Sequence, residues 1–187
     1  MKRDIQIFIA DDHPIIRQGM KQIIEMDQEL KIIGEAANGR AALDEIIKLA
    51  PEVAVLDIDM PEMDGLAVAQ SLKQKKLAVE IVVLTIHREE ALFHAAIDAG
   101  VKGYVLKESA MTDIVNSIKA AAAGQPYISP ALSAYLLGRN SRSASLQKEK
   151  PGIKNLSPTE KRILKVKAER KRHKEGLTQT NEIWGSP

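Results

Sequence analysis

Five polar residues stand at the ends of four short apolar runs in this sequence. They are Asp11, Asp12, Asp57, Thr85 and Lys107. Short apolar runs that are rich in β-branched residues and bounded by turn signals are typical of strands buried in a parallel sheet. In an open α/β sheet, the carboxyl ends of the strands form the edge where ligands bind. A single Asp could simply cap a turn, but independent caps would not all fall at the same end of four strands. We therefore predict a functional site at this edge.

Three of these residues are carboxylates, and carboxylates held close together repel one another. At about 4 Å and an effective dielectric constant near 20, each charged pair costs roughly 4 kcal/mol. A hard divalent cation offsets this repulsion, and Mg²⁺ suits it because it prefers oxygen ligands and leaves room for a phosphate oxygen. One protonated carboxyl would also relieve the repulsion, but it leaves the nearby Lys107 unexplained. We therefore predict a Mg²⁺ site.

The same residues could transfer a phosphoryl group. An Asp carboxylate can act as a nucleophile and form an aspartyl-phosphate, and Asp57 is the candidate. Lys107 would offset charge on the phosphoryl oxygens, and the Thr85 hydroxyl would donate a hydrogen bond to one of them. The sequence has no nucleotide-binding loop, since residues 100–103 lack the required glycine pattern. We therefore expect a small phosphodonor or a phosphorylated protein rather than ATP.

Alternating apolar strands and amphipathic helices must position these residues. Strands are predicted over residues 5–10, 30–36, 53–57, 79–85 and 103–106, with a helix after each of them. Parallel strands need crossover connections, and the helices supply them. We predict an α/β fold with a doubly wound, five-stranded parallel sheet covered by helices on both faces. A small α-helical, partly disordered appendage is expected at the C-terminus.

Composition and charge limit the classes of protein. With 187 residues and 44% hydrophobic content, the chain can bury one medium domain and a small appendage. The absence of cysteine excludes disulfides and thiolate metal sites. We see neither a signal peptide nor a run of about 18 apolar residues, so we expect a soluble cytoplasmic protein without a membrane partner. Residues 1–138 carry 14 Lys and Arg against 20 Asp and Glu, whereas residues 139–187 carry 13 against 5. The basic tail could therefore face a polyanion.

Three motifs around these positions resemble a known family. They are Asp-Asp-His-Pro at 11–14, Met-Pro-Glu-Met-Asp-Gly at 60–65 and Lys-Gly-Tyr-Val-Leu-Lys at 102–107. Together with the five polar residues, they make residues 4–135 similar to the receiver domain of two-component response regulators, in the NarL/FixJ (LuxR-type) branch. The resemblance implies a flavodoxin-like sheet with the strand order 2-1-3-4-5. It also implies a signalling protein rather than an enzyme, with self-phosphorylation and autodephosphorylation as its only reactions.

The resemblance implies a role for each residue of the phosphoacceptor site. Asp57 accepts the phosphoryl group from the histidine of a sensor kinase, with Thr85 and Lys107 as its catalytic partners. Thr85 and Tyr104 carry the switch: Thr85 is drawn toward the phosphoryl group and Tyr104 turns inward behind it. Phosphorylation could then lead to a homodimer.

The resemblance also implies a set of metal ligands and two tuning residues. Mg²⁺ is held by Asp11, Asp12, Asp57 and the main-chain carbonyl of Asp59. Asp59 and His87, two residues beyond Asp57 and Thr85 respectively, occupy positions that tune dephosphorylation. His13 is interpreted as structural rather than as a metal ligand.

The C-terminal segment departs from the family pattern. We predict a receiver domain over residues 1–125, a helix and linker over 126–155, and an incomplete LuxR-type helix-turn-helix over 156–187. A capping box at Ser157 and Glu160 begins the last segment, which is about half the length of the family's output domain. The family implies DNA as a partner. Without a recognition helix in the major groove, however, we expect only weak, salt-sensitive DNA binding through basic residues.

Other functions remain open on the sequence alone. A divergent output domain could still bind a specific operator, or the receiver could act as a phosphate sink or a dimerising inhibitor. Asp57-Ile58-Asp59 also resembles the Asp-x-Asp motif of haloacid-dehalogenase-type phosphatases. That family places its nucleophile strand first and its acidic pair late, which is the reverse of the order here. Pro61 also stands where that family has Thr or Val, so a phosphatase is the least favoured function.

Overall fold

The structure is a computed structural model that describes residues 4–135. The chain divides into two units, residues 1–139 and 140–187, and all described residues belong to the first unit. The output segment predicted over residues 156–187 lies outside the described residues. None of the helices in the described part is long and apolar enough to cross a membrane.

The described residues form one sheet of six parallel strands. These are β1 (Ile5–Ala10), β2 (Leu30–Ala36), β3 (Val53–Asp57), β4 (Glu80–Thr85), β5 (Gly103–Leu106) and β6 (Tyr127–Ile128). In space they follow the order β2-β1-β3-β4-β5-β6, and every neighbouring pair is parallel. The predicted doubly wound, flavodoxin-like fold and its order 2-1-3-4-5 are confirmed for the first five strands.

The predicted number of five strands is wrong, because β6 adds a sixth at the edge of the sheet. Its two residues pair with Gly103 and Tyr104 of β5. A strand of two residues between two prolines is too short to show the alternation by which strands are predicted. Residues 130–135 are then helical, and Leu132 is buried in the same hydrophobic cluster as Tyr104. β6 and the helical residues that follow it therefore pack against β5.

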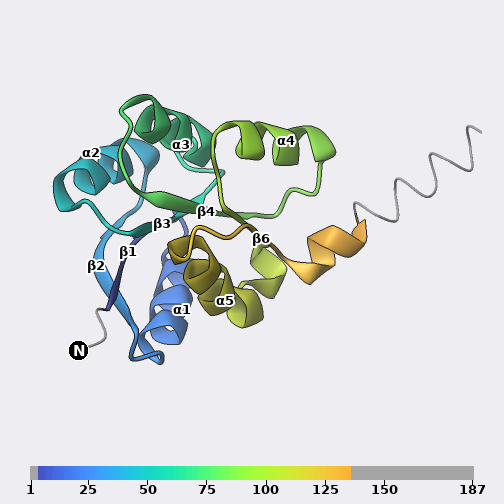
Figure 1. Ribbon diagram of the computed structural model, residues 1–187, viewed down its shortest axis with the longest axis horizontal. Helices are drawn as coiled ribbons and strands as arrows, with labels where there is room; N and C mark the ends of the chain where they lie inside the picture. Colours follow the sequence, from blue (N-terminus) through green and yellow to red (C-terminus); the bar gives the residue numbers. More distant parts are fainter. Residues whose placement is uncertain (1–3, 136–187) are drawn as a thin grey trace, which may run out of the picture. The chain divides into compact units, whose positions relative to one another are not determined.

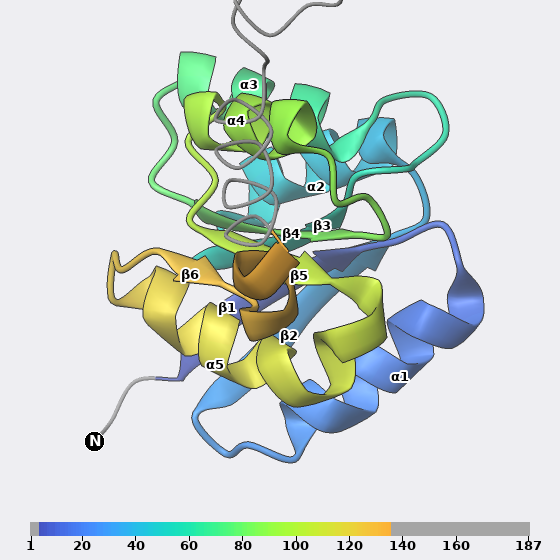
Figure 2. The same ribbon diagram turned by 90° about the vertical axis from the view of Figure 1, so that its right-hand side faces the viewer.

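Helices cover both faces of the sheet (Figure 1 and Figure 2). They are α1 (Pro14–Glu25), α2 (Gly39–Leu49), α3 (Gly65–Gln74), α4 (Glu90–Asp98) and α5 (Ala110–Ala122). α1 and α5 pack on one face, and α2, α3 and α4 pack on the other. In β1, Phe8 faces the cluster with α2 to α4, whereas Ile9 faces the cluster with α1 and α5. Because both faces are covered, the central strands are apolar throughout, as the sequence shows.

The loop after β3 is held tightly against the strand that carries Asp57. Asp64 caps α3, since its carboxylate accepts a hydrogen bond of 2.7 Å from the N–H of Ala67. Gly65 follows, and its N–H donates to the carbonyl of Ile58 at 3.0 Å. A Cβ at Gly65 would lie 2.1 Å from the main-chain oxygen of Asp57, so only glycine fits this close approach. The start of α3 is thereby fixed directly beside the end of β3.

Candidate functional site

A single ammonium group lies between two buried carboxylates at the carboxyl edge of the sheet. Asp57 is the last residue of β3, Asp11 follows β1, and Lys107 follows β5. The Nζ atom of Lys107 donates a hydrogen bond of 2.6 Å to Oδ2 of Asp57 and lies 3.0 Å from Oδ2 of Asp11. Both carboxylates are fully buried, and the Lys107 side chain is only 10% exposed. Residues far apart in the sequence thus meet at one point, as the positions of the strand ends predict.

The loop between β1 and α1 brings two more side chains to this point. The main-chain N–H of His13 donates to Oδ1 of Asp11 at 2.8 Å, and Nδ1 of His13 lies 2.6 Å from Oδ1 of Asp12. One ligand atom from each of Asp11, Asp12, His13 and Asp57 lies within 4.8 Å of the others. The structure therefore places His13, which is interpreted from the sequence as structural, within the acidic cluster.

Burial makes the negative charge of Asp57 costly in the absence of a cation. Burial, opposed by the hydrogen bond from Lys107 and assisted by the charge of Asp11, raises the pKa of Asp57 to about 6. Burial lowers the pKa of Lys107, but the hydrogen bond to Asp57 and the close Asp11 carboxylate outweigh it, so the net pKa is raised. Lys107 therefore stays charged at neutral pH and offsets only part of the carboxylate charge. A further cation at this edge would be bound favourably.

The donor atoms of the cluster fit a hard divalent cation. Oδ2 of Asp11 and Oδ1 of Asp12 are buried and make no hydrogen bond within the described part of the chain. Their neighbours Lys107 and His13 approach as close ion pairs without hydrogen-bond geometry. Buried carboxylate oxygens whose hydrogen bonding is incomplete are stabilised when a cation completes their coordination. Carboxylate oxygens are the ligands that Mg²⁺ prefers, so the residues present fit the predicted ion.

The loops that follow β3 and β4 are linked by a His–Asp pair. Nε2 of His87 lies 3.1 Å from Oδ1 and 2.9 Å from Oδ2 of Asp59. Thr85 ends β4 and is buried, and its Oγ1 accepts a hydrogen bond of 2.9 Å from the main-chain N–H of His87. The main-chain N–H of Asp59 donates to Oδ1 of Asp57 at 3.2 Å. The two residues predicted to tune dephosphorylation are therefore in direct contact, which the sequence alone did not indicate.

Tyr104 lies in the core behind this edge. It is 1% exposed, and its ring packs edge-on against Phe93 of α4 with ring centroids 5.4 Å apart. The hydroxyl approaches Thr85 but makes no hydrogen bond of ordinary geometry among the described residues. Burial raises the pKa of Tyr104 to about 12, although the nearby Thr85 hydroxyl lowers it. In this structure the side chain that is predicted to form part of the switch is already turned inward.

Tyr104→Phe tests whether the buried hydroxyl is satisfied in this conformation. A buried polar group without a hydrogen bond destabilises a protein by about 1–3 kcal/mol. We therefore expect Tyr104→Phe to keep or raise the free energy of unfolding, measured by urea denaturation and far-UV circular dichroism. A loss of more than about 1 kcal/mol would mean that the hydroxyl has a partner.

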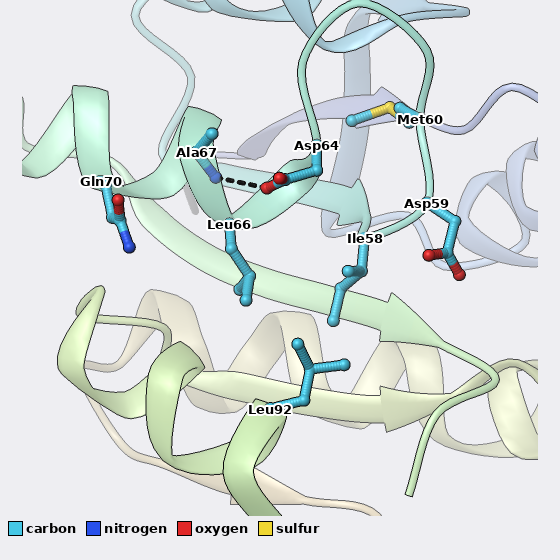
Figure 3. A pocket seen from close by; sticks show the side chains of 8 residues that line it. All are labelled: Ile58, Asp59, Met60, Asp64, Leu66, Ala67, Gln70 and Leu92. Atoms are coloured by element: carbon cyan, nitrogen blue, oxygen red, sulfur yellow. Dashed lines mark hydrogen bonds between the residues drawn. The ribbon is translucent and has the colours of Figure 1, made fainter. Parts of the chain in front are cut away.

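A hollow opens beside the acidic edge, between α3 and α4 (Figure 3). Its volume is about 460 Å³. Ile58, Leu66 and Leu92 point toward one another across it, and Asp59 lies at its rim. Neither Asp11 nor Lys107 lines this hollow, so it is distinct from the point where Lys107 meets the two carboxylates.

The sequence matches the response regulator receiver domain over residues 7–119, which is more than half of the chain. It is 34% identical over 163 residues to the nitrate/nitrite response regulator protein NarL of Escherichia coli (strain K12), covering 87% of this chain and 74% of that protein. It is 31% identical over 163 residues to the transcriptional regulatory protein YdfI of Bacillus subtilis (strain 168), with the same two coverages, 87% and 74%.

Solved structures give the same result. The signal receiver domain of the response regulator NarL from Mycobacterium tuberculosis superimposes with a TM-score of 0.64 at 33% identity, covering 66% of this chain and 99% of that chain. The response regulator RcsB of Salmonella typhimurium superimposes with a TM-score of 0.65 at 28% identity, covering 90% of this chain and 78% of that chain. The residues matched include every strand end that contributes to the acidic edge.

Proposed function

The chain belongs to the response regulator receiver family, in its NarL/LuxR-type branch, and on this premise we propose that Asp57 accepts a phosphoryl group from a sensor histidine kinase. Family membership implies two-component signalling. The observation that carries the proposal is the contact of one ammonium with two buried carboxylates, in which Lys107 lies 2.6 Å from Asp57 and 3.0 Å from Asp11. A site that holds excess negative charge around a nucleophilic carboxylate suits phosphoryl transfer once a cation is bound.

Asp57 is the proposed nucleophile. One of its carboxylate oxygens attacks the phosphorus atom of a phosphohistidine, the P–O bond forms as the P–N bond breaks, and the departing imidazole nitrogen takes up a proton from water. The N–H of Asp59 and the ammonium of Lys107 hold the two oxygens of Asp57 at 3.2 Å and 2.6 Å respectively, so the nucleophile is oriented before reaction. Lys107 then offsets the charge of the transferred phosphoryl group.

Mg²⁺ is the proposed cofactor. Asp11, Asp12 and Asp57 would hold it, together with the main-chain carbonyl of Asp59. When bound, the ion neutralises charge on the phosphoryl oxygens. The buried Oδ2 of Asp11 and Oδ1 of Asp12 make no hydrogen bond of ordinary geometry among the described residues, which supports their assignment as ligands.

Thr85 and Tyr104 are the proposed switch, and Asp59 and His87 the proposed tuning pair. Because the Thr85 hydroxyl oxygen accepts from the His87 N–H, its own hydrogen remains available for a phosphoryl oxygen. Among the described residues, the Tyr104 hydroxyl makes no hydrogen bond of ordinary geometry that would hold the Thr85 hydroxyl in place. The pair formed by Asp59 and His87 is joined to Asp57 through the N–H of Asp59, and from there it would limit the access of water to the phosphoryl group.

Transcription regulation is the proposed downstream role, with DNA and a second phosphorylated copy of the chain as partners. The relative YdfI is described as a transcriptional regulatory protein, and a similar solved structure is described as a DNA-binding response regulator of the LuxR family. Operator binding that requires residues 156–187 would support this role. Phosphorylation without DNA binding would instead support a phosphate sink or a dimerising inhibitor.

Metal-dependent uptake of one phosphoryl group tests the proposed chemistry. The full chain is incubated with acetyl phosphate and Mg²⁺, and intact-mass and peptide analysis are expected to find one phosphoryl group on Asp57. EDTA should prevent the uptake, because the carboxylates then repel the phosphodonor. Asp44→Asn, an exposed substitution on α2, should behave as the wild type. Phosphorylation elsewhere, or equal uptake in EDTA, would contradict the proposal.

A further inference from the structure

Arg17 fastens the loop that carries the two acidic residues after β1. It lies in the first turns of α1, and its Nη1 donates a hydrogen bond of 2.7 Å to the main-chain carbonyl of Asp11. Its Nε lies 3.5 Å from Oε2 of Glu35 on β2. The Arg17 side chain is only 18% exposed. One guanidinium group therefore ties the end of β1 to the neighbouring strand.

The Asp11 carboxylate accepts a hydrogen bond from the His13 N–H and lies beside Lys107, but few other contacts hold the main chain of Asp11. His13 stands at the start of α1, and its side chain makes no capping hydrogen bond within the described part of the chain. Besides the Arg17 contact, the main chain of Asp11 is held by a bond of 3.3 Å from its N–H to the carbonyl of Ala36. That distance is long for an N–H···O bond, whereas a short, charge-assisted bond such as that of Arg17 is stronger. Arg17 is thus the main restraint on the carbonyl side of Asp11.

We propose that Arg17 is a positioning residue that sets the direction in which the carboxylates of Asp11 and Asp12 face Asp57, and thereby the affinity of the site for Mg²⁺. This inference rests on the proposed function, because Mg²⁺ is part of it. Arg17 touches the main chain of Asp11 and not its carboxylate, so it acts through the loop. Groups that orient metal ligands in this way typically contribute about 10- to 100-fold to metal affinity.

The charge of Arg17 and its positioning role predict opposite effects on Mg²⁺ binding. If Arg17 acted only as a nearby positive charge, its removal would strengthen cation binding. If it holds the loop, its removal lets the carboxylates turn away and weakens binding. Lys21 separates the two effects, because it also pairs with Glu35, at 3.2 Å, and no contact of it with Asp11 occurs among the described residues.

The experiment measures Mg²⁺ affinity in the full-length chain. Titrations with Mg²⁺ alone are followed by amide NMR shifts for the wild type, Arg17→Gln, Arg17→Lys and Lys21→Gln. We expect the dissociation constant to rise about tenfold or more for Arg17→Gln, less for Arg17→Lys, and to stay within about twofold of the wild type for Lys21→Gln. The rate of phosphorylation by acetyl phosphate at limiting Mg²⁺ should follow the same order.

Equal or tighter Mg²⁺ binding by Arg17→Gln would overturn the inference, as would an equal loss in Lys21→Gln. Urea denaturation in EDTA shows whether each variant is folded, and Arg17→Lys carries the test if Arg17→Gln does not fold. A wild-type chain that binds Mg²⁺ without phosphorylation of Asp57 contradicts the proposed function but leaves the affinity comparison valid. A wild-type chain that binds no Mg²⁺ overturns both.

Discussion

Asp57→Asn is expected to abolish phosphoryl uptake and, at the same time, to raise the free energy of unfolding of the metal-free protein by up to about 3 kcal/mol at pH 8. Uptake is lost because an amide cannot replace the carboxylate as the nucleophile. Stability rises because burial lifts the pKa of Asp57 from 3.8 to about 6, and each pKa unit corresponds to about 1.4 kcal/mol. The substitution removes a charge that the folded protein holds unfavourably.

The stability effect should depend on pH in a defined direction. The folded protein binds the Asp57 proton more tightly than the unfolded chain, because its folded pKa of about 6 exceeds 3.8. Between these values the folded state carries more protons, so the stability of the wild type falls as the pH rises. The penalty is absent below about pH 4 and complete above about pH 6. The advantage of Asp57→Asn should therefore vanish at low pH.

Urea denaturation in EDTA, followed by far-UV circular dichroism across this pH range, measures the difference between the two proteins. Taking the difference cancels the titration of groups that both proteins share. Excess Mg²⁺ should reverse the order at pH 8, because the ion stabilises the folded wild type in proportion to its binding, whereas the Asp57→Asn variant offers it only an amide at this position. If the wild type were instead more stable than Asp57→Asn in EDTA at pH 8, the site formed by Asp57, Asp11 and Lys107 would carry no excess negative charge.

The arrangement of the sheet and of the acidic edge follows from local features of the sequence. Apolar runs such as 53–56 are recognisable because both faces of a parallel strand are buried. Parallel strands run in the same direction, so the polar residues that end these runs are predicted to lie at the same edge of the sheet. Asp57, Asp11 and Lys107 meet for this reason alone, and their contact needs no knowledge of the side-chain packing.

Other features depend on contacts between elements that no local pattern records. The two-residue β6 exists only because the chain returns along the edge of β5. The bond from Arg17 to the carbonyl of Asp11 and the pair formed by Asp59 and His87 join side chains from different loops. In the sequence, Arg17 is only a single basic residue in the first turns of a predicted helix. Helices commonly carry such residues on their exposed faces, so its position does not indicate a contact with Asp11.

Lys107→Met is expected to destabilise the metal-free protein by about 3–5 kcal/mol and to slow phosphoryl uptake by about 100-fold or more. Lys107 is the ammonium that lies 2.6 Å from Asp57 and 3.0 Å from Asp11. Without it, two buried carboxylates face each other with no opposing charge. The transferred phosphoryl group also loses a donor to its oxygens, which is a transition-state effect rather than a stability effect.

These two consequences can be separated because a cation can replace one function of Lys107 but not the other. Excess Mg²⁺ should restore much of the stability of Lys107→Met by neutralising the carboxylates, whereas the rate of uptake from acetyl phosphate should remain low. Combining Lys107→Met with Asp57→Asn should restore stability in EDTA, since one of the two repelling charges is then absent. Lys31→Met, at an exposed position on β2, controls for the loss of a surface charge. If Mg²⁺ restored the rate together with the stability, Lys107 would be a structural counter-charge only, and the phosphoryl group would need no donor from this chain beyond Thr85 and the main chain.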